Sequence, residues 1–223
     1  MVFLFDESAG KDSFSIRGES FKYLIKVRRH SVGDEIDFRS SSDTTKLYRY
    51  KITSIDNRSL DLELLEAKTY EVKTKKPLHI GWCIIDTKSI EKVLPSLCEI
   101  GVEKISFISC DRSQRNFRLD FKRFERILQT SMQQSGRSSF MEFGSFKNVK
   151  EFISEFPHAK VFDFCDKSLD DYSDIDTVLI GCEGGFSQDE REFLKQKDVF
   201  SLDTPMVLRS ESAVMAVASK ILL

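Results

Sequence analysis

The chain has 223 residues, 40% of them hydrophobic and 31% charged, and its formal net charge at pH 7 is −2. This profile is typical of a globular protein with one large or two small domains, and it excludes a disordered chain. No apolar run approaches the roughly 20 residues that span a bilayer, and the N-terminal segment lacks the basic start of a signal peptide. The five scattered cysteines contain no CxxC pair. We therefore expect reduced thiols, a cytoplasmic location and no metal site.

The first 72 residues predict a small β-barrel domain. Segments that alternate apolar and polar side chains, bounded by turn residues, are expected to form strands at 35–39, 47–55 and 59–67. A short helix is expected at Phe21–Arg29. The lysine-rich stretch 68–77 predicts a linker that ends at Pro77.

From residue 73 to residue 223 the pattern predicts a second domain of alternating strands and helices. Strands are expected at 78–85, 104–110, 159–165 and 177–182. Helices are expected at 88–101, 121–136, 187–197 and 212–222. Gly101 is a natural C-terminal end for the first of these helices, whereas Pro95 inside it predicts a kink or a late start. The alternation indicates an α/β fold with a parallel sheet and helices on both faces.

Basic residues gather in two segments, 17–30 and 112–137. They include Arg17, Arg28, Arg29, Arg112, Arg115 and Arg137. Any one of these side chains is better explained as part of a solvated face. Two segments dense in arginine nevertheless favour a surface that binds phosphate groups, because the guanidinium matches their geometry.

The stretch TVLIGCEGGFSQDE, residues 177–190, places glycines between an expected strand and an expected helix. It matches neither the P-loop nor the GxGxxG pattern. Ser187 and Glu190 predict a capping box, so part of the stretch is a helix start. A tight turn with positive φ at Gly184 or Gly185 would explain the glycines without a ligand.

Glu183 favours a ligand over a bare turn. An acid inside a glycine loop would repel phosphate, whereas it suits a cationic or hydroxyl-bearing ligand such as a sulfonium nucleoside. A β-branched residue at Gly184 is then expected to resist positive φ and to fill the space of that ligand.

A second constellation lies in residues 203–223, where an apolar piece precedes Arg209 and Glu211. These charges could pair with each other, cap a helix or stand at the mouth of a pocket. The helix that follows carries an apolar stripe that needs covering, by the sheet or by a partner subunit. The stripe contains Val214, Val217 and Ile221.

LIGCEGGFSQDE and VLRSESAVMA together resemble the paired signature of the RsmE family. KVRRHSVGDEIDF, CEIGVEKISFISCDRS and FERILQTSMQQSGR resemble further segments of the same family, in the same order. The resemblance implies a methyltransferase of the SPOUT superfamily that uses S-adenosylmethionine to methylate N3 of one uridine in 16S ribosomal RNA. It also implies a PUA-like RNA-binding domain at 1–72, a trefoil-knotted catalytic domain at 73–223, and a homodimer.

The resemblance further implies roles for individual residues. Arg209 would stabilise the uracil anion, and Glu211 would orient Arg209 or accept the proton. Cofactor binding would fall to Gly181, Glu183, Gly184, Gly185, Val207, Leu208 and Ser212. RNA binding would fall to Arg17, Arg28, Arg29, Arg112, Gln134 and Arg137. Cys182 stands where the family commonly has proline, and Ser96, Thr204 and Met206 also depart from its pattern.

Two alternatives stay open at this point. One is a SPOUT methyltransferase that acts on another RNA, such as tRNA. The other is a non-catalytic RNA-binding factor in ribosome assembly.

Overall fold

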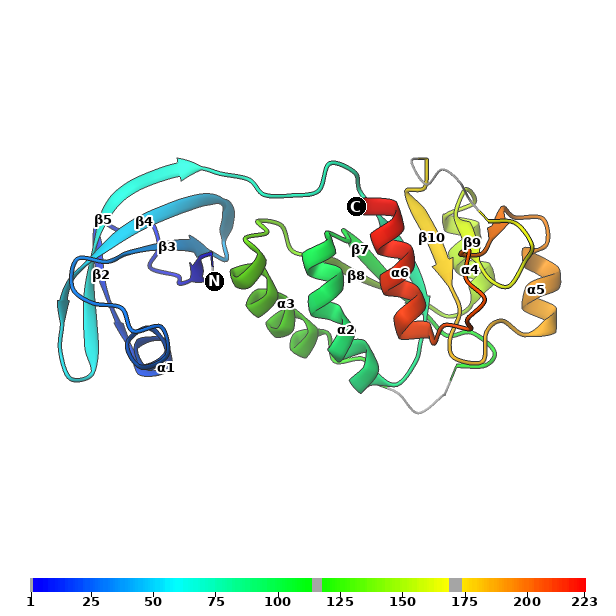
Figure 1. Cartoon of the computed structure of the whole chain (residues 1–223), viewed down its shortest axis with the longest axis horizontal. Helices are drawn as coiled ribbons and strands as arrows, with labels where there is room; N and C mark the ends of the chain where they lie inside the picture. Colours follow the sequence, from blue (N-terminus) through cyan, green and yellow to red (C-terminus); the bar gives the residue numbers. More distant parts are fainter. Residues whose placement is uncertain (1, 114–117, 169–173) are drawn as a thin grey trace. The chain divides into compact units, whose positions relative to one another are not determined.

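The computed structural model describes residues 2–113, 118–168 and 174–223 (Figure 1). Arg115 of the second basic segment lies outside the described residues. The chain divides into two compact units. The first comprises Met1–Lys73 and Met132–Ser139, and the second comprises Thr74–Ser131 and Phe140–Leu223.

The first unit is built on a curled five-stranded sheet in the order β1-β3-β4-β5-β2. The strands are β1 (Leu4–Phe5), β2 (Ser13–Arg17), β3 (Glu35–Ser40), β4 (Asp43–Ile55) and β5 (Ser59–Thr69). β1 runs parallel to β3, and the remaining neighbours are antiparallel. Phe14, Phe38 and Tyr50 meet edge to face in its core. This edge-to-face packing suits the charge distribution of aromatic rings.

The three predicted strands of this unit are confirmed, but other local predictions need correction. β1 and β2 were not predicted, because strands this short or this polar carry a weak pattern. The expected helix at Phe21–Arg29 begins earlier, as α1 (Gly18–Lys22), and continues as a π-helical turn, η1 (Tyr23–Val27). β5 extends to Thr69, so the linker begins at Tyr70.

The second unit contains a parallel sheet in the order β11-β9-β10-β6-β7-β8. Its strands are β6 (His79–Cys83), β7 (Lys104–Ile108), β8 (Glu142–Phe146), β9 (Lys160–Phe162), β10 (Thr177–Ile180) and β11 (Val199–Phe200). Its helices are α2 (Thr87–Ile100), α3 (Phe121–Ser135, whose end belongs to the first unit), α4 (Val149–Glu155), α5 (Gln188–Leu194) and α6 (Ser210–Leu222). Every strand pair in it is parallel, so all carboxyl ends lie on one edge.

Helices cover both faces of this sheet, as the sequence predicts. Successive strand residues point to opposite faces. Trp82 of β6 bonds to Ser210 of α6, which lies beside α2 on one face (Figure 1). On the opposite face, a Cβ atom on Gly81 would come within 2.4 Å of the Phe152 ring of α4. Glycine at this position therefore lets α4 pack directly on the strand.

Several predictions for the second unit are refined or wrong. Gly101 ends α2 in the left-handed region with φ 107°, as expected. The late start suggested for Pro95 is wrong, because α2 begins at Thr87 and runs through it. β8, α4 and β11 were not predicted. The apolar stripe of α6 is buried within the chain, where α6 packs on α2 and β10, so it needs no partner subunit.

Among the described residues, no helix is both long and apolar enough to cross a bilayer.

Candidate functional site

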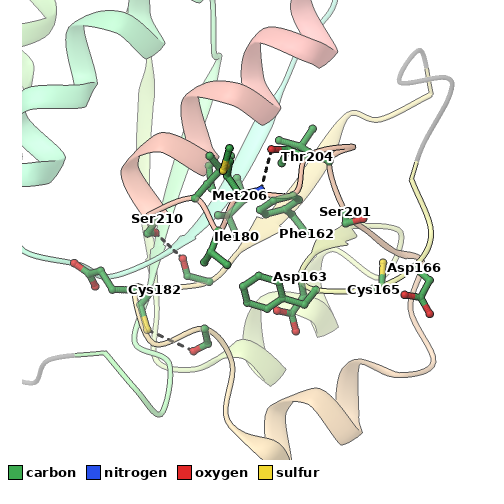
Figure 2. Close-up of a pocket in the computed structure, with 18 residues that line it drawn as sticks. Phe162, Asp163, Cys165, Asp166, Ile180, Cys182, Ser201, Thr204, Met206 and Ser210 are labelled. Carbon is green, nitrogen blue, oxygen red and sulfur yellow. Dashed lines mark hydrogen bonds between the residues drawn. The ribbon is translucent and has the colours of Figure 1, made fainter.

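A cavity of about 560 Å³ lies at the carboxyl ends of β9, β10 and β11 (Figure 2). Ligands in parallel α/β sheets bind at this edge, and cavities of this size hold small molecules and cofactors. Three loops and the start of α6 form its walls. The lining residues are 162–166 after β9, 180–183 and 185 around the glycine loop, 201, 202, 204 and 206–208 after β11, and Ser210 and Ala213 of α6.

The glycine loop closes as a tight turn in which Gly185 N–H donates to the Cys182 carbonyl at 2.9 Å. Gly185 carries the positive φ, 65°. A Cβ atom on Gly181 would lie 3.3 Å from Gly185 Cα, so the turn brings these two backbones together. A β-branched residue at Gly184 was expected to resist positive φ and to fill the ligand's space. This is wrong, because the φ of Gly184 is not positive and an added Cβ would meet Arg112 instead of the cavity.

Ser210 connects α6 to the glycine loop. Its hydroxyl donates to the Gly181 carbonyl at 2.6 Å and accepts from Trp82 Nε1 at 2.8 Å. Ser210 and Trp82 are both buried. Since buried polar groups need partners, this hydroxyl satisfies two groups at once and fixes the carbonyl at the end of β10.

The loop after β7 also holds the glycine loop in place, through Asp111 and Arg112. Arg112 Nη1 donates to the Gly184 carbonyl at 2.6 Å. Glu190 forms the predicted capping box with Ser187 and also accepts from Asp111 N–H at 3.0 Å. Burial raises the pKa of Glu190. The capping box therefore joins two loops as well as starting α5.

Acidic groups line the cavity. Asp163, Asp166 and Glu183 are among its walls, whereas no lysine, arginine or histidine is found among the described lining residues. Asp163 is held by a bidentate pair with Arg191, with N–O distances of 2.8 and 3.1 Å. Asp163 is thus neutralised by its partner, and Asp166 and Glu183 still favour a ligand with a positive group.

The predicted cofactor residues are only partly gathered at the cavity. Those that line it are Gly181, Glu183, Gly185, Val207 and Leu208. Gly184 and Ser212 do not. Arg209 is the N-cap residue of α6 and is exposed, and Glu211 lies in the first turn of the same helix, half-buried. Arg209 and Glu211 thus stand beside the cavity without forming its walls.

The predicted RNA-binding residues differ in exposure. Arg17, Arg28 and Arg29 are exposed in the first unit, as is Gln134. Arg29 has φ 60°, a conformation that side chains other than glycine rarely adopt and that often marks a functional position. Arg137, by contrast, is buried, and its Nε donates to the Ser139 carbonyl at 2.7 Å.

Sequence reasoning missed the loop after β9 and the role of Ser210. The strand expected at 159–165 ends at Phe162, and the residues that follow turn into the cavity wall. The rule that ligands bind at the carboxyl ends of parallel strands could have identified this loop. No local signal marked Ser210, because both of its partners are distant in sequence.

A family model described as an RNA methyltransferase domain matches residues 72–222. The chain is 38% identical, over 98% of both sequences, to the ribosomal RNA small subunit methyltransferase E of Helicobacter pylori strain ATCC 700392 / 26695. The chain belongs to the RsmE family of RNA methyltransferases. The resemblance noted in the sequence is thereby confirmed.

Solved structures agree with this membership at the level of the fold. A probable rRNA-methyltransferase from Porphyromonas gingivalis aligns with a TM-score of 0.76 at 22% identity, covering 97% of this chain and 95% of that one. A ribosomal RNA small subunit methyltransferase E from Neisseria gonorrhoeae aligns with a TM-score of 0.75 at 17% identity, covering 98% and 95%. The Neisseria protein was crystallised with S-adenosylmethionine.

Proposed function

We propose that this protein transfers a methyl group from S-adenosylmethionine to N3 of a specific uridine in 16S ribosomal RNA. The observation that carries the proposal is the acidic cavity beside the glycine loop, in a chain of the RsmE family. The Helicobacter relative, named as a small-subunit rRNA methyltransferase, supports the class of substrate.

The cavity fits S-adenosylmethionine in size and charge. Its volume of about 560 Å³ is in the range of nucleoside-sized ligands. The donor supplies an electrophilic methyl on a sulfonium cation, and the carboxylates of Glu183, Asp163 and Asp166 suit its positive groups. The turn at Gly185 exposes backbone toward the ligand, and the Val207–Leu208 segment offers backbone groups for the adenine edge.

Arg209 and Glu211 are proposed to act on the uracil. N3 of uridine carries a proton and is a weak nucleophile, so its reaction needs the proton removed and the resulting anion stabilised. The exposed Arg209 guanidinium beside the cavity would neutralise the negative charge on the uracil carbonyl oxygens. Glu211, one turn into α6, would orient Arg209 or accept the N3 proton.

RNA would be held by the exposed arginines of both units. Arg17, Arg28 and Arg29 would contact phosphates from the first unit, and Arg112 would do so beside the glycine loop. Because N3 is a base-pairing atom, the uridine must leave any helix before reaction. Methylation of ribosomal RNA in turn implies that the protein is cytoplasmic.

Finer features of the family fold belong to the same proposal. They are a PUA-like first domain at 1–72, a deep trefoil knot in the domain at 73–223, and a homodimer. The placement of β10 between β6 and β9, which both precede it in the chain, supports the knot. Exposed Phe164, Met206 and Val207 at the cavity rim support a partner subunit there.

The test compares small-subunit RNA from cells with and without the gene by mass-spectrometric mapping of methylated uridine. We expect one N3-methyluridine to be missing without the gene and to be restored by the wild-type protein. Arg209→Ala should fail to restore it while binding S-adenosylmethionine with near-normal affinity in calorimetry. A lost mark in tRNA would support the alternative substrate, and binding of RNA without donor binding would support the non-catalytic factor.

A further inference from the structure

Three buried thiols lie close together at the glycine loop, one of them within it. Cys83 lies at the end of β6, Cys110 follows β7, and Cys182 follows the first glycine of the loop. The Sγ atoms of Cys110 and Cys182 are 3.5 Å apart. Cys182 also lines the cavity, and its thiol donates to the Gly185 carbonyl at 3.5 Å (Figure 2). A sulfur pair at van der Waals distance thus adjoins the ligand site.

We propose that Cys110 and Cys182 are an oxidation site that forms a reversible disulfide with a small peroxide and thereby weakens ligand binding in the adjoining cavity. The first part stands on the geometry alone, and the second rests on the function proposed above. A disulfide bond is about 2.05 Å long. The two sulfurs must therefore approach by about 1.5 Å, starting from 3.5 Å.

The positions of the two residues allow this approach. Both follow the ends of their strands, in loops that can shift without breaking a ladder hydrogen bond of β7 or β10. Cys83, the third thiol, is fully buried, and its backbone is held in the ladder between β6 and β7, so it is less free to move. The cavity gives a molecule of the size of hydrogen peroxide a route to Cys182, and the Cys110 sulfur lies 3.5 Å behind the Cys182 sulfur.

The chemistry balances with hydrogen peroxide as the oxidant. The contact between the two sulfurs is the largest cause that lowers the pKa of Cys110, and the same contact raises the pKa of Cys182. The Cys110 thiol loses its proton and the thiolate attacks one peroxide oxygen. The O–O bond breaks, a sulfenic acid forms, and the released hydroxide takes up the lost proton as the first water. The Cys182 sulfur then attacks the Cys110 sulfur, its S–H proton leaves with the departing hydroxide as water, and the S–S bond forms. In total two thiols are oxidised and one peroxide is reduced to two waters.

The disulfide would change the cavity wall through Cys182. This residue stands between Gly181, whose carbonyl Ser210 holds, and the turn closed by Gly185. Drawing its sulfur toward Cys110 removes the contact with the Gly185 carbonyl and shifts the backbone that faces the ligand.

The site is tested on the purified full-length protein without ligand. After treatment with hydrogen peroxide, free thiols are alkylated and peptides are mapped by mass spectrometry. We expect a Cys110–Cys182 cross-linked peptide that dithiothreitol removes. It should be absent from Cys182→Ala and from Cys110→Ser, and present in Cys165→Ser, which removes the most accessible thiol. A different pairing, or sulfinic acid without a cross-link, would overturn the site.

The consequence is tested by calorimetry with S-adenosylmethionine before oxidation, after it, and after reduction. We expect the Kd of the wild type to rise about tenfold on oxidation and to recover with dithiothreitol. The reason is that the backbone around Cys182 no longer holds the shape that contacts the ligand. The Kd of Cys182→Ala should not respond to peroxide. An unchanged wild-type Kd in cross-linked protein would overturn the control of binding. Failure of the reduced protein to bind the donor would instead refute the proposed function and leave the mapped disulfide standing.

Discussion

Replacing Ser210 by alanine tests whether one hydroxyl holds α6 to the glycine loop. The change removes the acceptor of the Trp82 indole N–H and the donor to the Gly181 carbonyl. An unsatisfied buried polar group costs about 1–3 kcal/mol. Trp82 is fully buried, so its N–H carries that full range, whereas water in the cavity can reach the Gly181 carbonyl. We assign the Gly181 carbonyl about 1 kcal/mol, the low end of that range, and the Trp82 N–H about 1–3 kcal/mol. The expected loss in unfolding free energy is therefore about 2–4 kcal/mol.

The assay is urea unfolding followed by fluorescence. Trp82 is the only tryptophan in the sequence, so its emission reports on the site itself. With a slope near 2 kcal/mol/M, the expected loss lowers the unfolding midpoint by about 1–2 M. Ser219→Ala is the matched control, because it makes the same change later in α6 at a half-buried position. If Ser210→Ala and Ser219→Ala unfold at the same urea concentration, the bridging role of Ser210 is refuted.

Three further predictions concern the cavity, a buried imidazole and the first unit. Arg191→Ala removes the bidentate partner that fixes the Asp163 carboxylate in the cavity wall. We expect the loss of this fixed position to outweigh the added negative charge and to weaken S-adenosylmethionine binding about tenfold by calorimetry; an affinity equal to that of the exposed-pair control Lys195→Ala would contradict it. Burial, and then Lys104, lower the pKa of His79 from 6.5 to about 4, so the folded state holds fewer protons and stability present at pH 7 should fall as the pH drops from 6.5 toward 4. In urea unfolding across that window, His79→Phe should flatten the decline, and an unchanged slope would count against it. Arg29→Gly removes a cation from a residue with φ 60° and should fold normally while reducing the salt slope of RNA affinity by about 0.7–0.9; an unaltered slope would exclude Arg29 as a phosphate contact.

The sequence determined the local features of this protein, because their causes are local. Each of these features depends on residues that are close together in the sequence. They are the alternation in the β4 and β5 segments, the glycine that ends α2 and the capping box of α5. The alternation of strands and helices after the linker can also be read from local patterns, and it indicated a parallel sheet. The paired glycine-loop and α6 motifs indicated the family, since they are continuous stretches with a fixed composition.

Only the tertiary structure decided which of these residues meet. Trp82 and Ser210 are 128 residues apart, and Cys110 and Cys182 are 72 apart, so no spacing rule joins them. Sequence could not choose between Gly184 and Gly185 for the positive φ, because the choice depends on how Arg112 and the cavity flank the turn. The grouping of Met132–Ser139 with the first unit likewise depends on contacts made after the chain has folded back, such as that between Gln133 and Phe5. Local pattern fixes the elements, whereas the order β9-β10-β6 and the loops at its carboxyl edge create the cavity.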